Sequence, residues 1–294
     1  MALLLADAQR LTNNQFVQGI VDTIVTESAV LQYLPFMELN GNSLIYNQEA
    51  TLSGSSWYAP ADTWTEQAVT VTQKTAVLKI LGGDVDVDNF LNQTFRNPNE
   101  LRAEAVAKKA KAIAYGFNDA FFNGTGSSNQ PTGLKNLVTA GQTRSLGTNG
   151  ASPTLDDFDA LIDMIKPGKP DAIFMSKRTR RGLKKLRRGI NNVLDQDINQ
   201  FGQRVEFYDG IPVIVDENIS DTETVGTSTD CSRVYAVQFG YGQGIMGLMN
   251  GMIQADEVGN LETKDAYRTR IKWYCGLVNF RDLALAALTG VRPN

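Results

Sequence analysis

Two unusually long alternating segments constrain this chain more than any other feature. From Ser43 to Ala50 and from Ala68 to Leu81, apolar or β-branched residues alternate with polar ones. A period of two predicts antiparallel strands joined as a hairpin. A strand of about 13 residues reaches roughly 40 Å, whereas a compact chain of 294 residues has a radius of gyration of only about 19 Å. We therefore expect the hairpin to project from the body of the protein.

The segment between these strands, residues 51–67, combines a polar composition with large aromatic side chains. It contains Trp57, Tyr58 and Trp64 among Gly, Ser, Thr and Asp residues. Large exposed apolar groups usually mark interaction surfaces. We predict that these three residues contact another subunit.

Start and stop signals predict two helices, one on each side of the hairpin. Residues 12–15 have the form of a capping box, and apolar residues then recur at helical spacing until Pro35. Residues 97–100 supply an N-cap Asn, a Pro at the first helical position and an acidic third position. They predict a long, alanine-rich helix over 98–122 that serves as a structural beam.

A change in composition near residues 141–150 predicts a second lobe. This stretch is rich in Gly, Ser, Thr and Asn, and beyond it helical and strand patterns alternate. Such alternation is typical of a compact mixed domain. The expected helices are 155–166, capped by Thr154, and 177–190, and the expected strands are 172–175, 211–215 and 234–239.

The second of these helices carries a dense basic cluster between residues 177 and 188. Leu183, Leu186 and Ile190 lie on its opposite side, so we expect the helix to dock by its apolar side and turn a basic face outward. We favour contact with another copy of the chain, because the rest of the sequence has an excess of acidic residues. Nucleic-acid binding and plain solvation remain alternatives. The residues predicted for this contact are Arg180, Arg181, Lys184 and Lys185.

Composition excludes most of the common catalytic chemistries. Because the chain has no histidine, it cannot build a Ser-His-Asp triad, a Cys-His pair or an imidazole metal site. Cys231 and Cys275 form no CxxC pair and fit a reducing compartment. A net charge of −4 argues against a general nucleic-acid binder, and no apolar run approaches the roughly 18 residues of a membrane span. We expect a structural protein, not an enzyme, with no cofactor, metal or membrane contact.

Residues 242–247 match the GxGxxG fingerprint of dinucleotide-binding proteins. The fingerprint needs a helix to begin at its third glycine. Here Asn250-Gly251 follows between apolar runs and predicts a hairpin turn. We therefore expect strands and no nucleotide at this segment.

Asp84, Asp86 and Asp88 alternate, so on a strand their carboxylates share one face. The spacing resembles the start of a calcium loop, but Asn89 and Phe95 occupy the positions that need Gly and Glu. A solvated or intersubunit acidic face is the expected outcome, and a looser cation site is the alternative.

The order of these parts, over nearly the whole chain, resembles the major capsid protein of tailed bacteriophages, which has the Hong Kong 97 type of shell fold. The segments that carry the resemblance, besides the hairpin and the long helix, are residues 123–126, 129–134, 210–215 and 280–288. The resemblance implies an α+β fold in four parts. These are an N-terminal arm (1–42), an extended loop (43–81), a peripheral domain (82–140 and 241–294) with a spine helix (98–122), and an axial domain (141–240).

The resemblance also implies a function and partners. The chain would assemble into pentamers and hexamers of an icosahedral virion capsid around double-stranded DNA, and it would be made in the host cytoplasm. Because few residues precede the first helix, the resemblance implies either a separate scaffolding protein or a mature chain, together with a portal and, as an option, decoration proteins. Some relatives crosslink a lysine of the extended loop, but residues 51–67 contain no lysine, so we expect no crosslink there. The alternatives are an encapsulin-like nanocompartment and a dinucleotide-binding enzyme.

Overall fold

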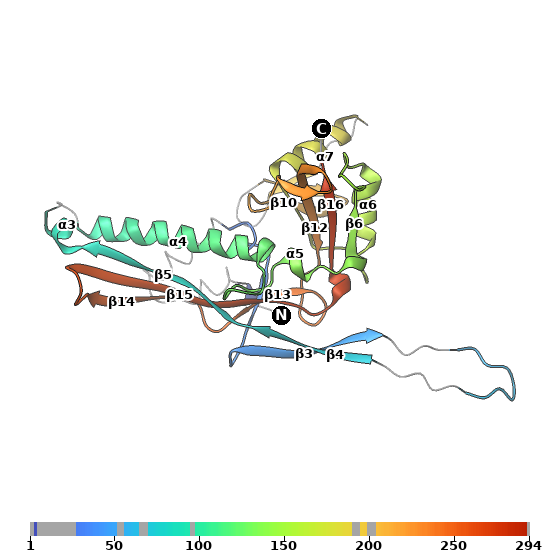
Figure 1. Ribbon diagram of the computed structural model, residues 1–294, viewed down its shortest axis with the longest axis horizontal. Helices are drawn as coiled ribbons and strands as arrows, with labels where there is room; N and C mark the ends of the chain where they lie inside the picture. The colour runs from blue at the N-terminus through green and yellow to red at the C-terminus, as the bar shows by residue number, and fades with distance from the viewer. Residues whose placement is uncertain are drawn as a thin grey trace.

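The computed structural model describes residues 3–4, 28–51, 56–64, 70–94, 98–189, 195–198 and 204–292. It shows a long flat layer of strands with one helix, a compact lobe beside one end of this layer, and a ribbon of two strands that extends away from both (Figure 1). Most of the helix predicted from residue 12 onwards lies outside the described residues. Its described end is a turn region in which Val30, Leu31 and Leu34 are fully buried.

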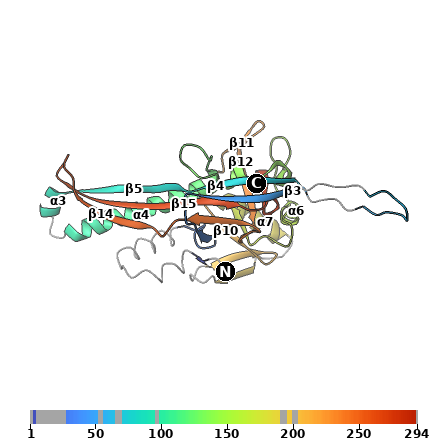
Figure 2. The same cartoon turned by 90° about the horizontal axis from the view of Figure 1, so that it is seen from below.

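The ribbon consists of β3 (Ser43–Thr51) and β4 (Thr70–Val77), which pair in antiparallel orientation. It projects from the body, as the alternating segments predict, and Figure 2 shows it along the long axis of the flat layer. The second predicted strand is interrupted at Leu78. Beyond this residue the chain continues as β5 (Lys79–Asp88), which pairs with β15 (Ala266–Asn279). One stretch of chain therefore belongs first to the ribbon and then to the body.

A six-stranded sheet forms the flat layer, with β15 at its centre. Cys275 of β15 pairs with Lys79 on one side and with Met249 on the other. The strands before and after Asn250-Gly251 both pair with β15, so the hairpin predicted at this turn is wrong. The long β15 accepts the two strands one after the other along one edge. The remaining strands of the sheet are β1 (Leu3–Leu4), β2 (Pro35–Glu38), β13 (Ile245–Met249) and β14 (Gln254–Asn260).

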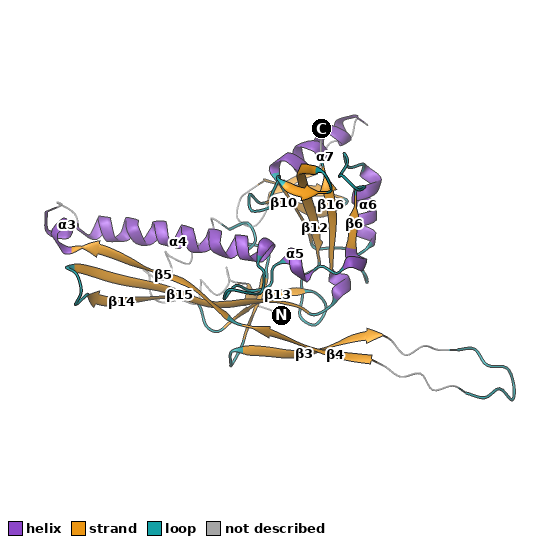
Figure 3. Ribbon diagram, viewed as in Figure 1, coloured by secondary structure: helices purple, strands orange, loops and turns teal. Residues whose placement is uncertain are grey.

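The long helix α4 (Pro98–Asn123) lies against this sheet (Figure 3). The predicted helix is confirmed, and it begins at Pro98 as its start signals require. Its apolar side faces the sheet, where the ring centroid of Phe117 lies 5.0 Å from that of Trp273 and 6.0 Å from that of Phe36. The buried residues on this side include Val106, Ala110, Ile113, Phe117 and Phe121.

The compact lobe is built on an eight-stranded sheet in the order β6-β16-β12-β7-β10-β9-β8, with β11 paired to β12. The predicted alternation of strands and helices is confirmed. One strand differs from our assignment, because β16 (Leu285–Val291) lies between β6 and β12 and not in the peripheral sheet. The rest of the division into domains stays a prediction. The other strands are β6 (Thr143–Ser145), β7 (Ala172–Met175), β8 (Asp195–Ile198), β9 (Arg204–Tyr208), β10 (Ile211–Val215), β11 (Glu223–Val225) and β12 (Ser228–Val237).

Two helices, α6 (Leu155–Asp163) and α7 (Lys177–Gly189), cover one face of the lobe's sheet and bury Phe158 and Leu183 in a common apolar cluster. Helix α6 begins with a capping box, in which Thr154 and Asp157 satisfy each other's backbone amides. Short helical segments complete the fold: α3 (Asn89–Thr94), α5 (Leu134–Leu137) and single 3-10 turns at Ala140–Gln142 and Asp282–Ala284. Among the described residues, no helix is long and apolar enough to cross a membrane.

Candidate functional site

The inner face of the ribbon is fixed to the body at its root. The Tyr46 hydroxyl donates to the Asn279 carbonyl at 3.0 Å, and the Tyr46 ring centroid lies 5.4 Å from that of Phe280. Burial and the nearby Asp282 carboxylate raise the pKa of Tyr46, so its hydroxyl remains a donor. Lys74 adds an ion pair to Asp282 at 3.2 Å. The apolar residues of this contact include Leu44, Ala76, Met246, Leu248 and Val278. Together they fix the direction in which the ribbon leaves the body.

The outer face of the ribbon carries apolar side chains that are exposed in this chain. The exposed fraction is 60% for Ile45, 53% for Val71 and 43% for Val77. Residues two apart on a strand share a face, and Ile45 lies opposite Thr75 while Val77 lies opposite Ser43. A two-stranded ribbon is marginally stable by itself. A β-branched outer face of this kind is therefore suited to packing against another surface.

The ribbon tip, residues 56–64, presents the predicted aromatic side chains. Trp57 is fully exposed, Trp64 is 80% exposed, and the rings of Tyr58 and Trp64 stack with centroids 4.5 Å apart. A turn holds the tip, because the Ala59 amide donates to the Asp62 carboxylate at 2.6 Å. The exposed position of both indoles agrees with the sequence analysis, and their contact with another subunit stays a prediction.

Helix α7 divides the four predicted basic residues between two sides. Arg180 lies 3.9 Å from the Glu206 carboxylate, and Lys184 forms an ion pair with the same group. Arg181 and Lys185 are exposed. The prediction that all four face outward is wrong for Arg180 and Lys184, because Glu206 on β9 lies beneath them. Their role in subunit contact stays a prediction.

The projecting ribbon, the long helix on a flat sheet and the compact lobe are the parts that the capsid resemblance implies. The model of the phage capsid family matches residues 9–289. The chain belongs to this family. It is therefore a structural, shell-forming protein of the virion capsid. None of the curated proteins matches it in sequence.

Solved structures with the same fold include phage capsids and an encapsulin. The encapsulin SrpI of Synechococcus elongatus has a TM-score of 0.73 at 18% identity, and the match covers 100% of this chain and 98% of that chain. The capsid of the native GTA particle has a TM-score of 0.66 at 14% identity, covering 90% and 91%. Microbacterium phage Oxtober96 has a TM-score of 0.64 at 18% identity, covering 98% of each chain. At these identities the likeness shows the shared fold.

In this capsid protein the GxGxxG segment is a turn at residues 242–244 followed by the start of strand β13. Gly247, its third glycine, lies within β13 and pairs with Leu277 of β15. A Cβ atom at Gly247 would lie 2.4 Å from Phe36 Cε1, so glycine makes room for an aromatic ring of the core. A strand start lacks the free amides that hold a pyrophosphate at a helix N-terminus. The close packing of Phe36 therefore explains why the third position of the motif is a glycine.

Two of the three acidic residues of β5, Asp84 and Asp86, are paired with arginines of the neighbouring strand, whereas Asp88 is exposed and accepts from the Phe90 amide. Arg268 donates to both carboxylate oxygens of Asp86 at 2.6 and 2.8 Å, and Arg270 donates to those of Asp84 at 2.7 and 2.8 Å. The hydrogen bonds from Arg268 and Lys264 hold the pKa of Asp86 well below its usual range. The expectation of a solvated or intersubunit acidic face is therefore wrong for Asp84 and Asp86. Arginines within the chain fill the place that a cation would take.

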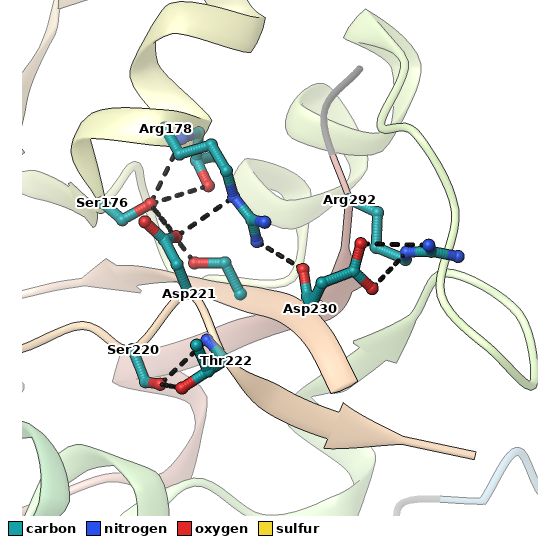
Figure 4. Close-up of polar contacts among 9 residues, drawn as sticks. Ser176, Arg178, Ser220, Asp221, Thr222, Asp230 and Arg292 are labelled. Carbon is teal, nitrogen blue, oxygen red and sulfur yellow. Dashed lines mark hydrogen bonds and ion pairs between the residues drawn. The ribbon is translucent and has the colours of Figure 1, made fainter. Parts of the chain in front are cut away.

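A polar cluster at the start of α7 was missed by the sequence analysis (Figure 4). Ser176 donates to the Asp221 carboxylate at 2.5 Å, and Arg178 lies 3.4 Å from the same group. Arg178 also donates to the Asp230 carbonyl at 2.5 Å, while the Asp230 carboxylate pairs with Arg292 at 2.7 Å. The cluster joins α7 to the chain end and to the loop before β11. It fixes the orientation of the basic helix.

Proposed function

We propose that this capsid protein assembles into pentamers and hexamers of a closed icosahedral shell around double-stranded DNA, with the ribbon joining neighbouring copies. The observation that carries this proposal is the ribbon itself. Its root is held by Tyr46 and Lys74, whereas its outer face and both tip indoles are exposed. A projection with an exposed apolar end gains stability when a second copy covers it.

The tip aromatics supply the energy that such a contact needs. A tryptophan side chain buries about 150–250 Å² when fully covered. Anchors of this type cost about 2–4 kcal/mol when truncated. The stack of Tyr58 on Trp64 orders both rings before contact, so less conformational entropy is lost on binding.

The remaining partners belong to the same proposal. They are a separate scaffolding protein, a portal, decoration proteins, and packaged DNA held without sequence preference. With a net charge of −4, the chain contacts DNA only at local basic patches. Cys231 and Cys275 are free and buried, in accord with synthesis in the reducing host cytoplasm. We further propose that the protein has no enzymatic activity and no contact with a membrane.

Electron microscopy of the purified protein, with an assay of its contents, tests the proposal. We expect closed shells, and shells recovered from infected cells should protect double-stranded DNA from nuclease. A subunit that stays monomeric at micromolar concentration over a range of salt would contradict it.

A second candidate is an encapsulin-like nanocompartment. It is favoured by the likeness to the SrpI encapsulin over the whole length of this chain. Contents distinguish the two functions, because a nanocompartment would enclose a cargo protein and no nuclease-protected DNA.

A further inference from the structure

Helix α7 is built from like charges that repel one another. Residues 177–189 include eight basic residues and no acidic one. Positive charges in the first turn oppose the helix dipole, and like charges four residues apart destabilise a helix. Burial of Leu183 docks the helix without any of these charges, so packing does not explain their density. The pairs at this spacing are Lys177 with Arg181, Arg180 with Lys184, Arg181 with Lys185, and Lys184 with Arg188.

Carboxylates from other elements compensate part of this charge. Three ion pairs connect α7 to them: Lys177 with Glu217, Arg178 with Asp221, and Lys184 with Glu206. On the side towards β9, the guanidinium of Arg187 lies 5.2 Å from the Tyr208 ring centroid, and Tyr208 donates to Asp159 of α6 at 2.6 Å. The acidic residues of α6 therefore border α7 on its Arg187 side.

Arg181 and Arg188 lie on the side of the helix away from Leu183, and within the described part of the chain no carboxylate pairs with either. Both are exposed. At 100° per residue they lie about 20° apart around the helix and about 10 Å apart along it. Arg187 lies about 100–120° away from both around the helix, so they are turned away from the acidic residues beyond Tyr208. We call Arg181 and Arg188 the arginine ridge.

The arginine ridge lies within a longer basic surface. Lys177 and Lys185 are exposed beside it, so positive charge extends over about 16 Å of the helix. Figure 1 shows α7 at the end of the compact lobe that is remote from the flat layer and the ribbon. Double-stranded DNA carries one negative charge per about 1.7 Å of its axis. Several phosphates would therefore face a surface of this length.

We propose that the arginine ridge binds the phosphate backbone of packaged double-stranded DNA, without preference for sequence. A guanidinium presents paired N–H donors to a phosphate, and each contact releases counterions from the DNA. A continuous line of negative charge suits a surface of one sign and relieves the repulsion within α7. This inference rests on the proposed packaging of DNA and names the surface that contacts it.

Contact with carboxylates of a second copy is the competing outcome. The acidic excess of the sequence favours it, but the fold uses part of that excess within the chain, since Asp84 and Asp86 pair with arginines of β15. These pairs place opposite signs side by side, unlike the single sign of α7. The arginine ridge therefore matches DNA better than it matches a surface of this kind.

Two variants and a control test the arginine ridge. The first variant combines Arg181→Gln with Arg188→Gln and removes both charges. The second combines Arg181→Lys with Arg188→Lys and keeps them. The control combines Lys108→Gln with Lys169→Gln, two exposed bases outside α7, and changes the net charge as much as the first variant. Circular dichroism checks each fold.

Fluorescence anisotropy with a short labelled duplex of mixed sequence measures the DNA affinity of each full-length protein over a range of salt concentrations. We expect the glutamine variant to bind about tenfold more weakly than the wild type at low salt. The slope of log affinity against log salt concentration should decrease in magnitude by about two. The lysine variant should keep most of this slope, and the control should keep both affinity and slope. A duplex of different sequence should give the same values.

Thermal melting separates DNA binding from a role in folding. The glutamine variant loses like-charge neighbours in α7, so it should melt no lower than the wild type at low salt. Added duplex should raise the melting temperature of the wild type more than that of the variant.

Equal affinity and slope in the glutamine variant and the wild type would overturn the inference, as would an equal loss in the control. A glutamine variant that melts well below the wild type would give the arginine ridge a structural role and also overturn it. So would a variant that binds duplex normally but forms no shells, because the ridge would then contact a second copy. In each case, wild-type shells that protect DNA leave the proposed function standing. If the wild type forms no shells, or shells without protected DNA, the proposed function fails, and this inference fails with it.

Discussion

The side-chain amide of Asn118 donates to the Asp216 carboxylate at 3.2 Å, which fastens the long helix α4 to the end of β10 in the compact lobe. Both residues are buried. The side-chain carbonyl oxygen of Asn118 accepts a hydrogen bond from the Ser28 hydroxyl. The oxygen of this hydroxyl accepts in turn from the Leu31 backbone amide. One asparagine therefore joins the end of the N-terminal region, the long helix and the lobe.

Replacing Asn118 by Ala should destabilise the subunit strongly. The change removes the partner of one Asp216 carboxylate oxygen and the acceptor of the Ser28 hydroxyl proton, at about 1–3 kcal/mol for each buried group. The other Asp216 oxygen keeps its hydrogen bonds from Asn218. Urea unfolding of the unassembled subunit measures the loss. The matched control is Gln93→Ala, which removes an exposed side-chain amide from α3 and should change the free energy of unfolding by less than about 0.5 kcal/mol. Equal effects in the two variants would contradict the role of Asn118.

Asp216 predicts a specific pH dependence. Burial raises its pKa, so the folded state binds this proton more readily than the unfolded state. The resulting stabilisation is present at low pH and is lost as the pH rises from about 4 through the raised value. Asp216→Asn cannot titrate. We expect its melting temperature, relative to the wild type, to increase between pH 4 and pH 7. Parallel curves would show that the ionisation of Asp216 does not affect folding.

Asp86 predicts a pH dependence of stability with the opposite sign. Hydrogen bonds from Arg268 and Lys264 lower its pKa, so its stabilisation is present above the usual aspartate value and is lost as the pH falls below about 4. Between pH 4 and pH 2, the melting temperature of the wild type should therefore fall further than that of Asp86→Asn. A thermal melt at each pH measures the difference. An equal decline in both proteins would mean that the pairing contributes nothing to stability.

Local patterns in the sequence were sufficient to predict the elements whose signals lie close together. The start of α4 at Pro98 depends on its own first turn, and the ribbon depends on alternation within its own strands. The position of β16 beside β12 depends on pairing between segments far apart in the chain. So does the placement of β13 and β14 along one edge of β15. Such registers are decided by tertiary packing, which a local pattern does not contain.

The candidate surfaces likewise divide into features that a local sequence pattern predicts and features that depend on contacts far apart in the chain. The tip aromatics could be predicted because Trp57 and Trp64 stand in a polar loop of a projecting hairpin. The partners of charged residues could not be predicted in this way. Lys184 is paired with Glu206 on β9, and Asp86 is paired with Arg268, far along the chain. Helical spacing predicted where the basic residues lie around α7, but only the fold shows that Glu206 lies beside Lys184.

The ribbon tip gives the most direct test of assembly, because its loss should affect folding and assembly unequally. Trp57 and Trp64 are exposed in the subunit, so Trp57→Ala and Trp64→Ala should change the free energy of unfolding by less than about 0.5 kcal/mol. If a neighbouring copy covers them, each substitution should remove about 2–4 kcal/mol from every contact and abolish shells at concentrations where the wild type assembles. Tyr115→Ala, which removes an exposed ring from α4, controls for general loss of aromatic surface. Circular dichroism and light scattering measure the two effects separately. Variants that unfold would place the indoles in a core of their own subunit, and variants that form normal shells would show that the tip makes no essential contact.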